Sequence, residues 1–567
     1  MGTTLSLNGL PDDYFIFLEN GKRLYGDDTY ARINVAKIKR IEILNGASSA
    51  LYGTNAIGGV INIITDDVKN AINVSSDTRY ASKGRFTQSV NIDVNTGKFG
   101  SYTSYRRQQA EGWQLNPYEE NSKTHELEET GKVASTGFYA NTVNQKFTFD
   151  ATDKLSFYAR GGYYDNKTRR PYEAYDYNIL HETFNYGIGA QYMINKGNYI
   201  TADCYADHFS SSYCFFKDNK TYNGKAGEEQ VRKRTRNHNL SIKGIFKLGN
   251  RHKLSVGTEY IVDVLKSQTD NIAKEDAYTL ALFAQDEIKL LRNLQALIGV
   301  RYIYHENFKN HATPNVALMY KPGKFNFRAS YAAGFRTPTL SELYATDIAK
   351  KNDRLTIGNL DLKPEKNNYF SLSAEYVHER FSVSVNAFYN NIRDMIDYNT
   401  IATGDKAMEQ YGHKEVRQRD NIAEAKVHGI NVSANAYLGA GFNLSGGYTH
   451  LNTQDVELEQ PIDKSIKNAY NINAQWAHSW KIYRLNINLN GRFNSKRFSK
   501  SYGYAPEYQL WDLNTRHSFN LKSVIIEPGC GMENLFDYMD DRPYNSNYAT
   551  LTPGRSFYIS LSLKFKS

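Results

Sequence analysis

Cysteine is scarce in this chain, and long hydrophobic runs are missing. The 567 residues include only 3 cysteines, an odd number that implies no disulfide framework. On one extended strand, Cys204 and Cys214 would lie roughly 30 Å apart, far beyond the roughly 7 Å that a disulfide allows between Cα atoms. No stretch approaches the roughly 18 uninterrupted apolar residues of a spanning helix. These absences exclude a disulfide scaffold and a helical membrane protein.

Proline is also rare, with 12 residues, whereas the chain contains 44 tyrosines and 28 phenylalanines. Only 40% of the residues are hydrophobic, which fits a soluble protein. It equally fits a membrane barrel, because barrel strands alternate lipid-facing and lumen-facing side chains. Tyrosine suits the interface girdles of such a barrel, although a tyrosine-rich soluble β-sandwich array has the same composition. The net charge of +9 is modest for this length, and no nucleic-acid signature accompanies it.

Alternation with a period of two is the strongest local pattern. In SFYISLSLKF near the carboxyl end, one face carries Phe557, Ile559, Leu561, Leu563 and Phe565, and the other carries small or polar residues. The same pattern runs through RLNINLNGRF, FSVSVNAFY and GINVSANAYL. These runs have the roughly 9–11 residues of a membrane-spanning strand, whereas soluble strands typically have about 5–6. The pattern favours a barrel with a polar lumen.

Short and long connections alternate in step with these strands. Tight turns are expected at Lys321–Lys324, Glu379–Arg380 and Gly439–Gly441, and long polar segments at Thr339–Lys363 and Arg393–Glu424. Outer-membrane barrels have short turns at one rim and long loops at the other. If strands and connections together average roughly 20 residues or slightly more, residues 70–567 form about 22 antiparallel strands. A barrel that wide is an open pore unless something fills it.

The first seventy residues have a different pattern, that of a small α+β unit. YFIFLENGKRL predicts a buried strand followed by a turn at Asn20-Gly21, and IKRIEIL and VINIIT predict two more strands around a loop of small residues. The glycines of this region lack the Gly-Lys-Ser/Thr of a phosphate cradle. We therefore expect them to allow close packing against a wall.

The segment KIKRIEILNGASSALYGTNAIGGVINIIT closely resembles the end of the plug domain of TonB-dependent outer-membrane receptors. ALFAQDEIKL, GFRTPTLSELY, GNLDLKPEKNNYFSLSAEY and the closing strands GMENLFDYMDDRPY and TPGRSFYISLSLKF resemble barrel segments of the same family. The resemblance implies that residues 1–69 are the C-terminal part of the plug and residues 70–567 the transmembrane barrel. The TonB box and the first half of the plug are absent, as is an export signal after Met1, so the true amino-terminus is expected to be missing.

The resemblance also implies functional positions. The plug motif comprises Arg40, Glu42, Gly46, Tyr52, Gly53, Gly58 and Gly59, and the receptor loop motif comprises Arg336, Pro338, Tyr344, Asn359 and Leu360. Glu287 and Glu365 are the expected barrel partners of the plug, with Arg40 as the main anchor, because Asn45 stands where the family usually has a basic residue. Ala47 stands where it usually has proline. Alternatively, Arg40 and Glu42 are the solvated side of a half-buried strand.

The implied function is import of a scarce, bulky ligand across the outer membrane, driven by the TonB complex. The ligand would be a metal chelate or corrin of the ferric siderophore, heme or cobalamin class. No histidine lies between Arg336 and Lys363, which counts against heme, and His413 is expected to be a solvated loop residue. Neither catalysis, a cofactor nor a metal site is expected. A passive channel or adhesin is the alternative, because the barrel pattern supports it equally.

Overall fold

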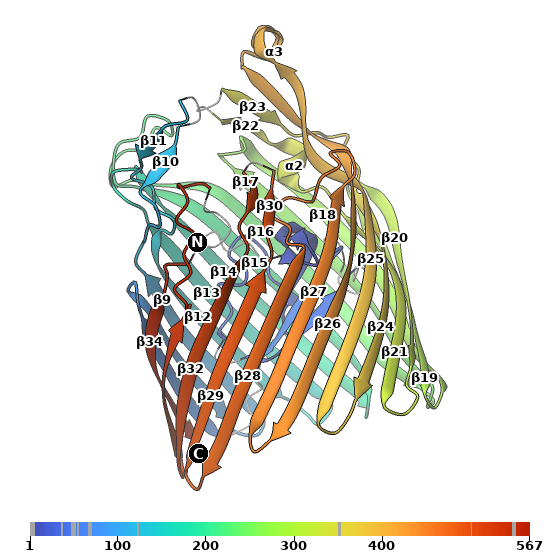
Figure 1. Cartoon of the computed structure of the whole chain (residues 1–567). Helices are drawn as coiled ribbons and strands as arrows, with labels where there is room; N and C mark the ends of the chain where they lie inside the picture. Colours follow the sequence, from blue (N-terminus) through green and yellow to red (C-terminus); the bar gives the residue numbers. More distant parts are fainter. Residues whose placement is uncertain are drawn as a thin grey trace.

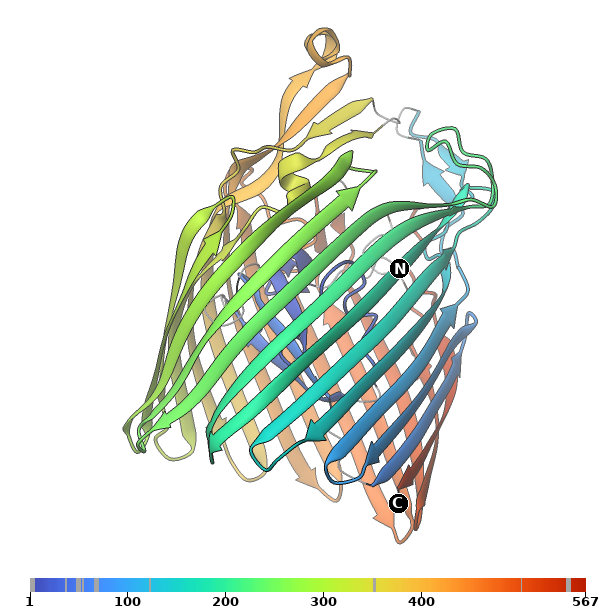
Figure 2. The same ribbon diagram turned by 180° about the vertical axis from the view of Figure 1, so that it is seen from behind.

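A small mixed sheet lies inside a large closed barrel (Figures 1 and 2). The structure, a computed structural model, describes residues 6–35, 38–46, 53, 56–65, 71–121, 124–349, 353–500, 502–546 and 552–566. Among these residues no helix has the length and apolar character needed to cross a membrane.

The barrel wall consists of 22 antiparallel strands within the described residues, and the last strand closes on the first. The strands are β7 (Ile72–Ala81), β8 (Arg85–Asn95), β9 (Phe99–Ala110), β12 (Gly137–Asp150), β13 (Leu155–Arg169), β14 (Tyr177–Asn195), β15 (Asn198–Phe215), β16 (Glu229–Leu248), β17 (His252–Ser267), β18 (Ile272–Leu291), β19 (Leu294–His305), β20 (Lys309–Tyr320), β21 (Phe325–Arg336), β24 (Glu365–Val377), β25 (Phe381–Thr403), β26 (Glu415–Gly439), β27 (Phe442–Asp455), β28 (Asn468–Trp480), β29 (Tyr483–Asn494), β32 (Tyr508–Leu521), β33 (Val524–Glu533) and β34 (Ser556–Lys566). The predicted fold class and strand number are confirmed.

The two rims of the barrel differ. At the lower rim in Figure 1, here called the turn rim, consecutive strands are joined by tight turns. The predicted turns lie here, with Lys321–Lys324 between β20 and β21, Glu379–Arg380 between β24 and β25, and Gly439–Gly441 between β26 and β27. The upper rim, here called the loop rim, carries most of the long connections. The expected parity of short and long connections is therefore present.

Short elements decorate the loop rim. They are β10 (Tyr118–Glu120), β11 (Leu127–Glu129), α2 (Leu340–Tyr344), β22 (Thr346–Ala349), β23 (Arg354–Ile357), α3 (Gly404–Tyr411), β30 (Arg497–Ser499) and β31 (Gly503–Ala505). The prediction of a loop over Arg393–Glu424 is wrong, because β25 and β26 continue through most of it and α3 caps the hairpin. The buried apolar side chains of this hairpin gather in two small clusters, around Ile396 and around Val416, and do not alternate along the strands. The sequence therefore lacks the pattern that marks a spanning strand, although backbone pairing continues.

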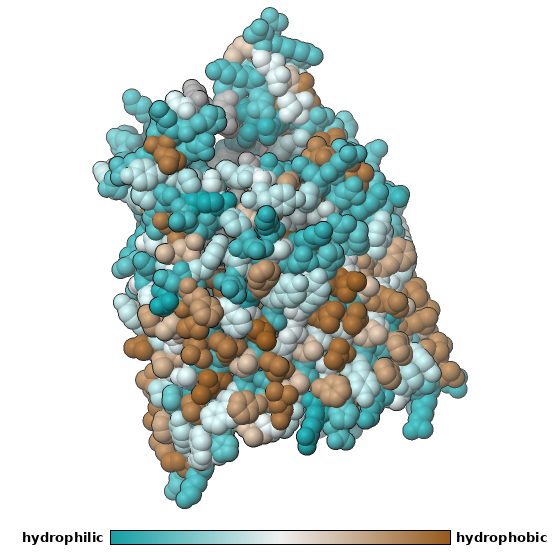
Figure 3. Space-filling model, in the orientation of Figure 1, coloured by the Kyte–Doolittle hydropathy of each residue, from teal (hydrophilic) through white to brown (hydrophobic). Residues whose placement is uncertain are grey.

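The outward face of the barrel is apolar. On β34 the five predicted side chains, from Phe557 to Phe565, are 40% to 66% exposed, whereas Ser562 on the opposite face is only 9% exposed. Figure 3 shows apolar residues gathered over the lower part of the barrel, below a polar upper part. An apolar surface of this extent is stable only against hydrocarbon. The predicted facing of the strand is therefore supported, and Cys204 and Cys214 lie on the single strand β15, as expected.

The lumen contains a four-stranded sheet with the order β4-β3-β6-β5, here called the plug. Its strands are β3 (Phe15–Glu19), β4 (Lys22–Arg23), β5 (Ile38–Asn45) and β6 (Gly59–Thr65), preceded by β1 (Ser6–Leu7), β2 (Leu10–Pro11) and the 3₁₀ turn η1 (Asp12–Tyr14). The three predicted strands and the Asn20-Gly21 turn are present. The predicted domain boundary at residues 69/70 falls within residues 66–70, outside the described part of the chain, and stays a prediction.

Candidate functional site

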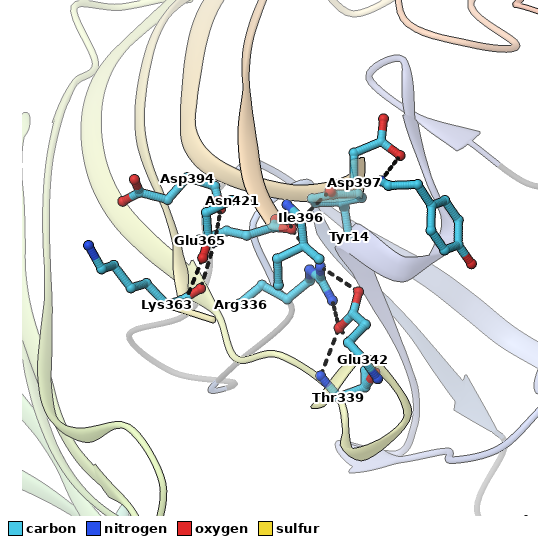
Figure 4. A network of polar contacts seen from close by, with 11 residues as sticks. Tyr14, Arg336, Thr339, Glu342, Lys363, Glu365, Asp394, Ile396, Asp397 and Asn421 are labelled. Atoms are coloured by element: carbon cyan, nitrogen blue, oxygen red, sulfur yellow. Dashed lines mark hydrogen bonds and ion pairs between the residues drawn. The ribbon is translucent and has the colours of Figure 1, made fainter. Parts of the chain in front are cut away.

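A buried charge network joins the wall to the loop rim (Figure 4). Arg336, the last residue of β21, donates from its two terminal nitrogens to the two carboxylate oxygens of Glu342, each at 3.0 Å. It also donates to Glu365, the first residue of β24, which is completely buried. A buried charge is stable only when it is paired and hydrogen-bonded. The arginine of the predicted loop motif therefore joins two wall strands to the α2 segment.

The same carboxylate caps helix α2. Thr339 is the N-cap residue, its hydroxyl accepts from the Glu342 backbone N–H at 3.2 Å, and the Glu342 carboxylate accepts from the Thr339 N–H at 2.8 Å. This reciprocal arrangement satisfies two otherwise unpaired helix donors. Burial alone would raise the pKa of Glu342, but Arg336 and the Thr339 N–H lower it below its usual value. The charged carboxylate is therefore the stable form in this network.

The other predicted loop-motif residues surround this network. Pro338 lines a cavity beside α2, and Tyr344 ends α2 and packs against a small buried apolar cluster. The Asn359 N–H donates to the Glu342 carbonyl at 3.1 Å, while the Leu360 side chain is 67% exposed. The motif thus fastens the α2 loop to the wall. A direct contact of these residues with ligand stays a prediction.

The plug reaches this network through Tyr14. Its hydroxyl donates to Glu365 at 3.3 Å, and its ring lies 5.5 Å from the Arg336 guanidinium. Burial, together with the Glu365 charge, raises the pKa of the Tyr14 hydroxyl well above its usual value, so it remains a donor. Glu365 is therefore a barrel residue that contacts the plug, although its plug partner is a tyrosine that the sequence did not single out.

The predicted ion pairs of Arg40 with the barrel are absent from the part of the chain that the structure describes. Arg40 pairs instead with Glu42 at 2.7 Å, and both side chains are well exposed, at 53% and 39%. Glu287 pairs with Lys253 of the neighbouring strand at 2.9 Å, also exposed. Arg40 and Glu42 lie on β5, an edge strand of the plug sheet, and their side chains are solvated, as the alternative interpretation expected. The strand is not half-buried, however, because Ile41 and Ile43 on its other face are 53% and 54% exposed.

The strongest plug anchors lie elsewhere. Arg32 of the plug donates to both carboxylate oxygens of Asp207 on β15 at 3.1 Å, and the two side chains are 5% and 0% exposed. Lys22 pairs with Asp203 on the same strand at 2.6 Å. In the opposite sense, Arg106 on β9 donates to the Ile33 carbonyl of the plug at 2.5 Å. Two carboxylates on the lumen face of DCYADHF, Asp203 and Asp207, were the available sequence signal, but nothing in the sequence identified their partners.

A second set of contacts surrounds Asp28 of the plug. Its carboxylate lies 2.8 Å from the His181 ring nitrogen on β14 and accepts a hydrogen bond from Asn166 on β13 at 3.2 Å. Burial alone would raise the pKa of Asp28, but His181 and Asn166 lower it below its usual value of 3.8. Plug docking is thus supported by a group that titrates in acid.

The plug-motif glycines allow close packing, as expected. A Cβ on Gly46 would lie 2.2 Å from the Tyr369 ring of the wall, and a Cβ on Gly53 would lie 3.4 Å from the Arg301 guanidinium. Both have positive φ angles, of 80° and 85°. Gly58 donates its N–H to the Tyr14 carbonyl at 2.7 Å, and a Cβ on Gly59 would lie 2.3 Å from the Leu44 carbonyl oxygen. The predicted Tyr52 lies outside the described residues.

A cavity of about 360 Å³ lies between the plug hairpin and the wall. The plug contributes Lys22, Arg23 and Gly53, and α2 forms part of its lining with Leu340 and Ser341. The wall strands contribute Glu259, Asp263 and Arg301 among others. The cavity lies beside the loop-rim helix α2, and it has charged groups of both signs.

Two arginine–tyrosine groups lie near the loop rim. On the extended β25–β26 hairpin, the Arg419 guanidinium lies 3.6 Å from the centroid of the Tyr398 ring and donates to its hydroxyl at 2.6 Å. On the β14–β16 wall, Arg232 lies 5.3 Å from the Tyr213 ring centroid and 4.9 Å from the Tyr222 ring centroid. Guanidinium stacked on an aromatic ring offers a positive charge beside a flat apolar surface.

Both groups are on the lumen side. Tyr213 lies on the same face of β15 as Phe209, four residues earlier, and Phe209 meets the plug at Gly26. Arg419 acts electrostatically on the Asp13 carboxyl of the plug. Burial and neighbouring Asp12 raise the pKa of Asp13, and Arg336 and Arg419 counteract that rise. The two groups therefore border the space above the plug.

The family models agree with this architecture. The model of the TonB dependent receptor-like beta-barrel matches residues 84–526, and the model of the TonB-dependent receptor plug domain matches residues 1–60. The chain belongs to the TonB-dependent receptor family and is an outer-membrane protein. In such barrels the short turns face the periplasm and the long loops face the outside, so the loop rim is extracellular.

Solved structures share the whole fold. A mutant of the ferric enterobactin receptor PfeA from Pseudomonas aeruginosa superposes with a TM-score of 0.83 at 17% identity, over 98% of this chain and 91% of that one. The siderophore receptor PirA from Acinetobacter baumannii has a TM-score of 0.79 at 16% identity, over 98% and 91%. The FrpB iron transporter from Neisseria meningitidis has a TM-score of 0.77 at 13% identity, over 99% and 93%. Identities this low show a common fold.

Proposed function

We propose that this protein imports an anionic, aromatic metal chelate of the ferric siderophore class across the outer membrane, with energy supplied through TonB. The observation that carries the proposal is the pair of arginine–tyrosine groups bordering the space above the plug. Arg419 on Tyr398, and Arg232 on Tyr213 and Tyr222, each present a fixed positive charge beside a flat ring. A planar, negatively charged chelate matches both features.

The plug supports import over the alternative of a passive channel or adhesin. A barrel of 22 strands would otherwise enclose an open lumen, and here a folded sheet lies inside it. Buried pairs such as Arg32–Asp207 hold that sheet to the wall. Passage of a bulky ligand then requires work on the plug, which is the task of an energy-coupling partner.

The charge of the site favours a chelate over the other two ligand classes. Heme import commonly relies on histidine ligation of the iron, and no histidine lies between Arg336 and Lys363 of the α2 loop. His413, just after α3, has its ring nitrogen 2.9 Å from the Asp353 carboxylate. The Arg–Tyr groups offer nothing specific to a corrin ring. The ranking therefore places ferric siderophores first.

Uptake by whole cells tests this proposal. Cells that lack their own iron receptors and express this receptor would be given iron as a catecholate chelate, a hydroxamate chelate or heme, and cobalt as cobalamin. We expect energy-dependent uptake of the catecholate chelate, the anionic and aromatic one. Uptake of the hydroxamate chelate, heme or cobalamin alone, or equal uptake in de-energised cells, contradicts the proposal.

A matched pair of variants locates the ligand. Arg419→Ala removes the charge and the stacked pair, and should weaken chelate binding by roughly tenfold or more, since a desolvated cation–π contact contributes on the order of 2 kcal/mol. Lys406→Ala removes an exposed positive charge from α3 on the same hairpin and should change binding little. Equal effects of the two variants would mean that Arg419 acts only through long-range charge.

A further inference from the structure

The turn rim carries a ring of basic side chains. Ten turns join the strands at this rim, and all except the turn between β26 and β27 contain a lysine or an arginine. The ring comprises Lys98, Lys154, Lys196, Arg251, Arg292, Lys321, Lys324, Arg380, Lys481 and Lys522. Only Asp153 and Glu379 offer opposite charge within the same turns. The family motifs include none of these residues, although Arg251 lines a cavity together with Asn45 of the plug strand β5.

All ten side chains are exposed and have no protein partner. Each side chain is exposed to solvent, and within the described residues none makes a side-chain ion pair or hydrogen bond. Basic residues inside the barrel differ, since Arg32 and Arg336 are buried and paired with carboxylates. The ring therefore presents its charge to whatever surrounds the rim.

Aromatic neighbours fix the depth of the ring in the membrane. Five of the basic residues are directly followed or preceded in sequence by an exposed aromatic residue at a strand end. The five aromatic residues are Phe99, Tyr320, Phe325, Phe381 and Trp480, and each is between 40% and 45% exposed. Aromatic belts of outer-membrane barrels lie at the level of the lipid headgroups. The five bases beside these aromatic residues therefore lie immediately on the water side of the belt, at the depth of the lipid phosphates.

We propose that the turn rim binds the phosphate groups of anionic phospholipids in the periplasmic leaflet of the outer membrane. A lysine or arginine close to an anionic membrane surface contributes favourable energy that is lost with distance and with salt. Ten such groups around a closed rim hold the barrel at a fixed height without any specific pocket. A periplasmic protein or the cell-wall polymer would contact the turns from the periplasmic side. The aromatic neighbours instead place the bases beside the lipid headgroups, which favours lipid as the partner.

The test compares lipid preference in nanodiscs that contain the purified full chain. Spin-labelled phosphatidylglycerol and spin-labelled phosphatidylcholine are measured by electron paramagnetic resonance, which separates lipids immobilised on the barrel from bulk lipids. The turn variant replaces Lys98, Lys321, Lys324, Arg380 and Lys481 with glutamine. The matched control replaces five exposed loop-rim lysines, Lys83, Lys220, Lys225, Lys406 and Lys496, with glutamine.

The wild type and the loop-rim control should immobilise phosphatidylglycerol about fivefold more strongly than phosphatidylcholine at low salt, and the turn variant should show a preference of about twofold or less. The preference of the wild type should disappear at 1 M salt, where the Debye length is only about 3 Å. This salt titration decides the question even if the variant does not fold. The proposal is overturned if the wild type shows no preference, if the preference survives high salt, or if both variants lose it equally. Capture of cell-wall fragments by the turn rim, without any lipid preference, would also overturn it.

Discussion

Arg32 of the plug and Asp207 of barrel strand β15 form a buried ion pair between residues that lie 175 positions apart in sequence. Asp207 also accepts the Tyr25 backbone N–H at 3.0 Å, so its carboxylate is held by two parts of the plug. The pair thus joins a polar loop of the plug to the inward face of the wall. It is the most thoroughly desolvated of the plug's ion pairs with the barrel among the described residues.

Removal of one partner of this pair should loosen the plug. Breaking a buried pair typically costs about 3–5 kcal/mol, because an unpaired charge is left behind. Asp207→Ala should therefore lower the denaturant concentration at which half of the plug is released. The fluorescence of a label on the plug measures this release. Arg40→Ala is the matched control and should cost no more than about 1 kcal/mol, because its pair with Glu42 is exposed. Similar costs for the two variants would mean that packing alone retains the plug.

Gly46 should be intolerant of any side chain. Its φ of 80° is unfavourable for alanine by roughly 1–2 kcal/mol, and overpacking against the Tyr369 ring adds typically about 1–3 kcal/mol. Gly21 has a φ of 77° but nothing within 4 Å of its Cβ position. Gly46→Ala should thus destabilise plug docking clearly more than Gly21→Ala in the same denaturant assay. If the two substitutions cost the same, the contact with Tyr369 does not limit the packing.

The facing of β34 predicts opposite effects at neighbouring positions. Leu561 is 41% exposed on the lipid side, and an arginine there should cost about 2–4 kcal/mol near the midplane. Ser560 faces the lumen, where an arginine can be hydrated. Leu561→Arg should slow or prevent folding into vesicles, as measured by heat-modifiable electrophoretic mobility, while Ser560→Arg should fold. Equal tolerance of both would contradict the assigned facing.

Labelling of whole cells should separate the two rims. Epitope tags inserted after Leu360 and within α3 should bind antibody on intact cells, because both positions lie on the loop rim. A tag at Glu379–Arg380 should be labelled only after permeabilisation. Labelling of the α3 tag without the Leu360 tag would show that the strand count between them is wrong.

Acid should weaken plug docking partly through Asp28. Its pKa is lower in the folded state than its ordinary value of 3.8, so its contribution is fully present above that value and is lost as the pH falls through the folded value. The stability difference between the wild type and Asp28→Asn should therefore shrink between about pH 5 and pH 3. This stability difference is measured from the denaturant midpoints of plug release of both proteins at several pH values. A difference that stays constant over this range would assign the stabilisation to groups other than Asp28.

The sequence determined the class of fold and the number of strands. Alternation in SFYISLSLKF and its counterparts is a local property, since side chains of one strand point to opposite faces regardless of what surrounds it. The alternation of short turns with long loops along the chain then indicated which connections lie at the same rim of the barrel. Local patterns likewise identified the β3, β5 and β6 strands of the plug and the glycines that allow it to approach the wall.

The tertiary structure alone decided which charges meet. The family resemblance suggested Glu287 and Glu365 as partners of Arg40. The folded chain instead pairs Arg40 with Glu42, Glu287 with Lys253, and Glu365 with Arg336 and Tyr14. Which charges pair depends on the rotation and depth of the plug within the barrel. Neither quantity produces a periodic pattern in the sequence. The β25–β26 hairpin was mistaken for a loop because its strands are held by backbone pairing and by two small apolar clusters, around Ile396 and Val416, and not by a regularly alternating apolar face.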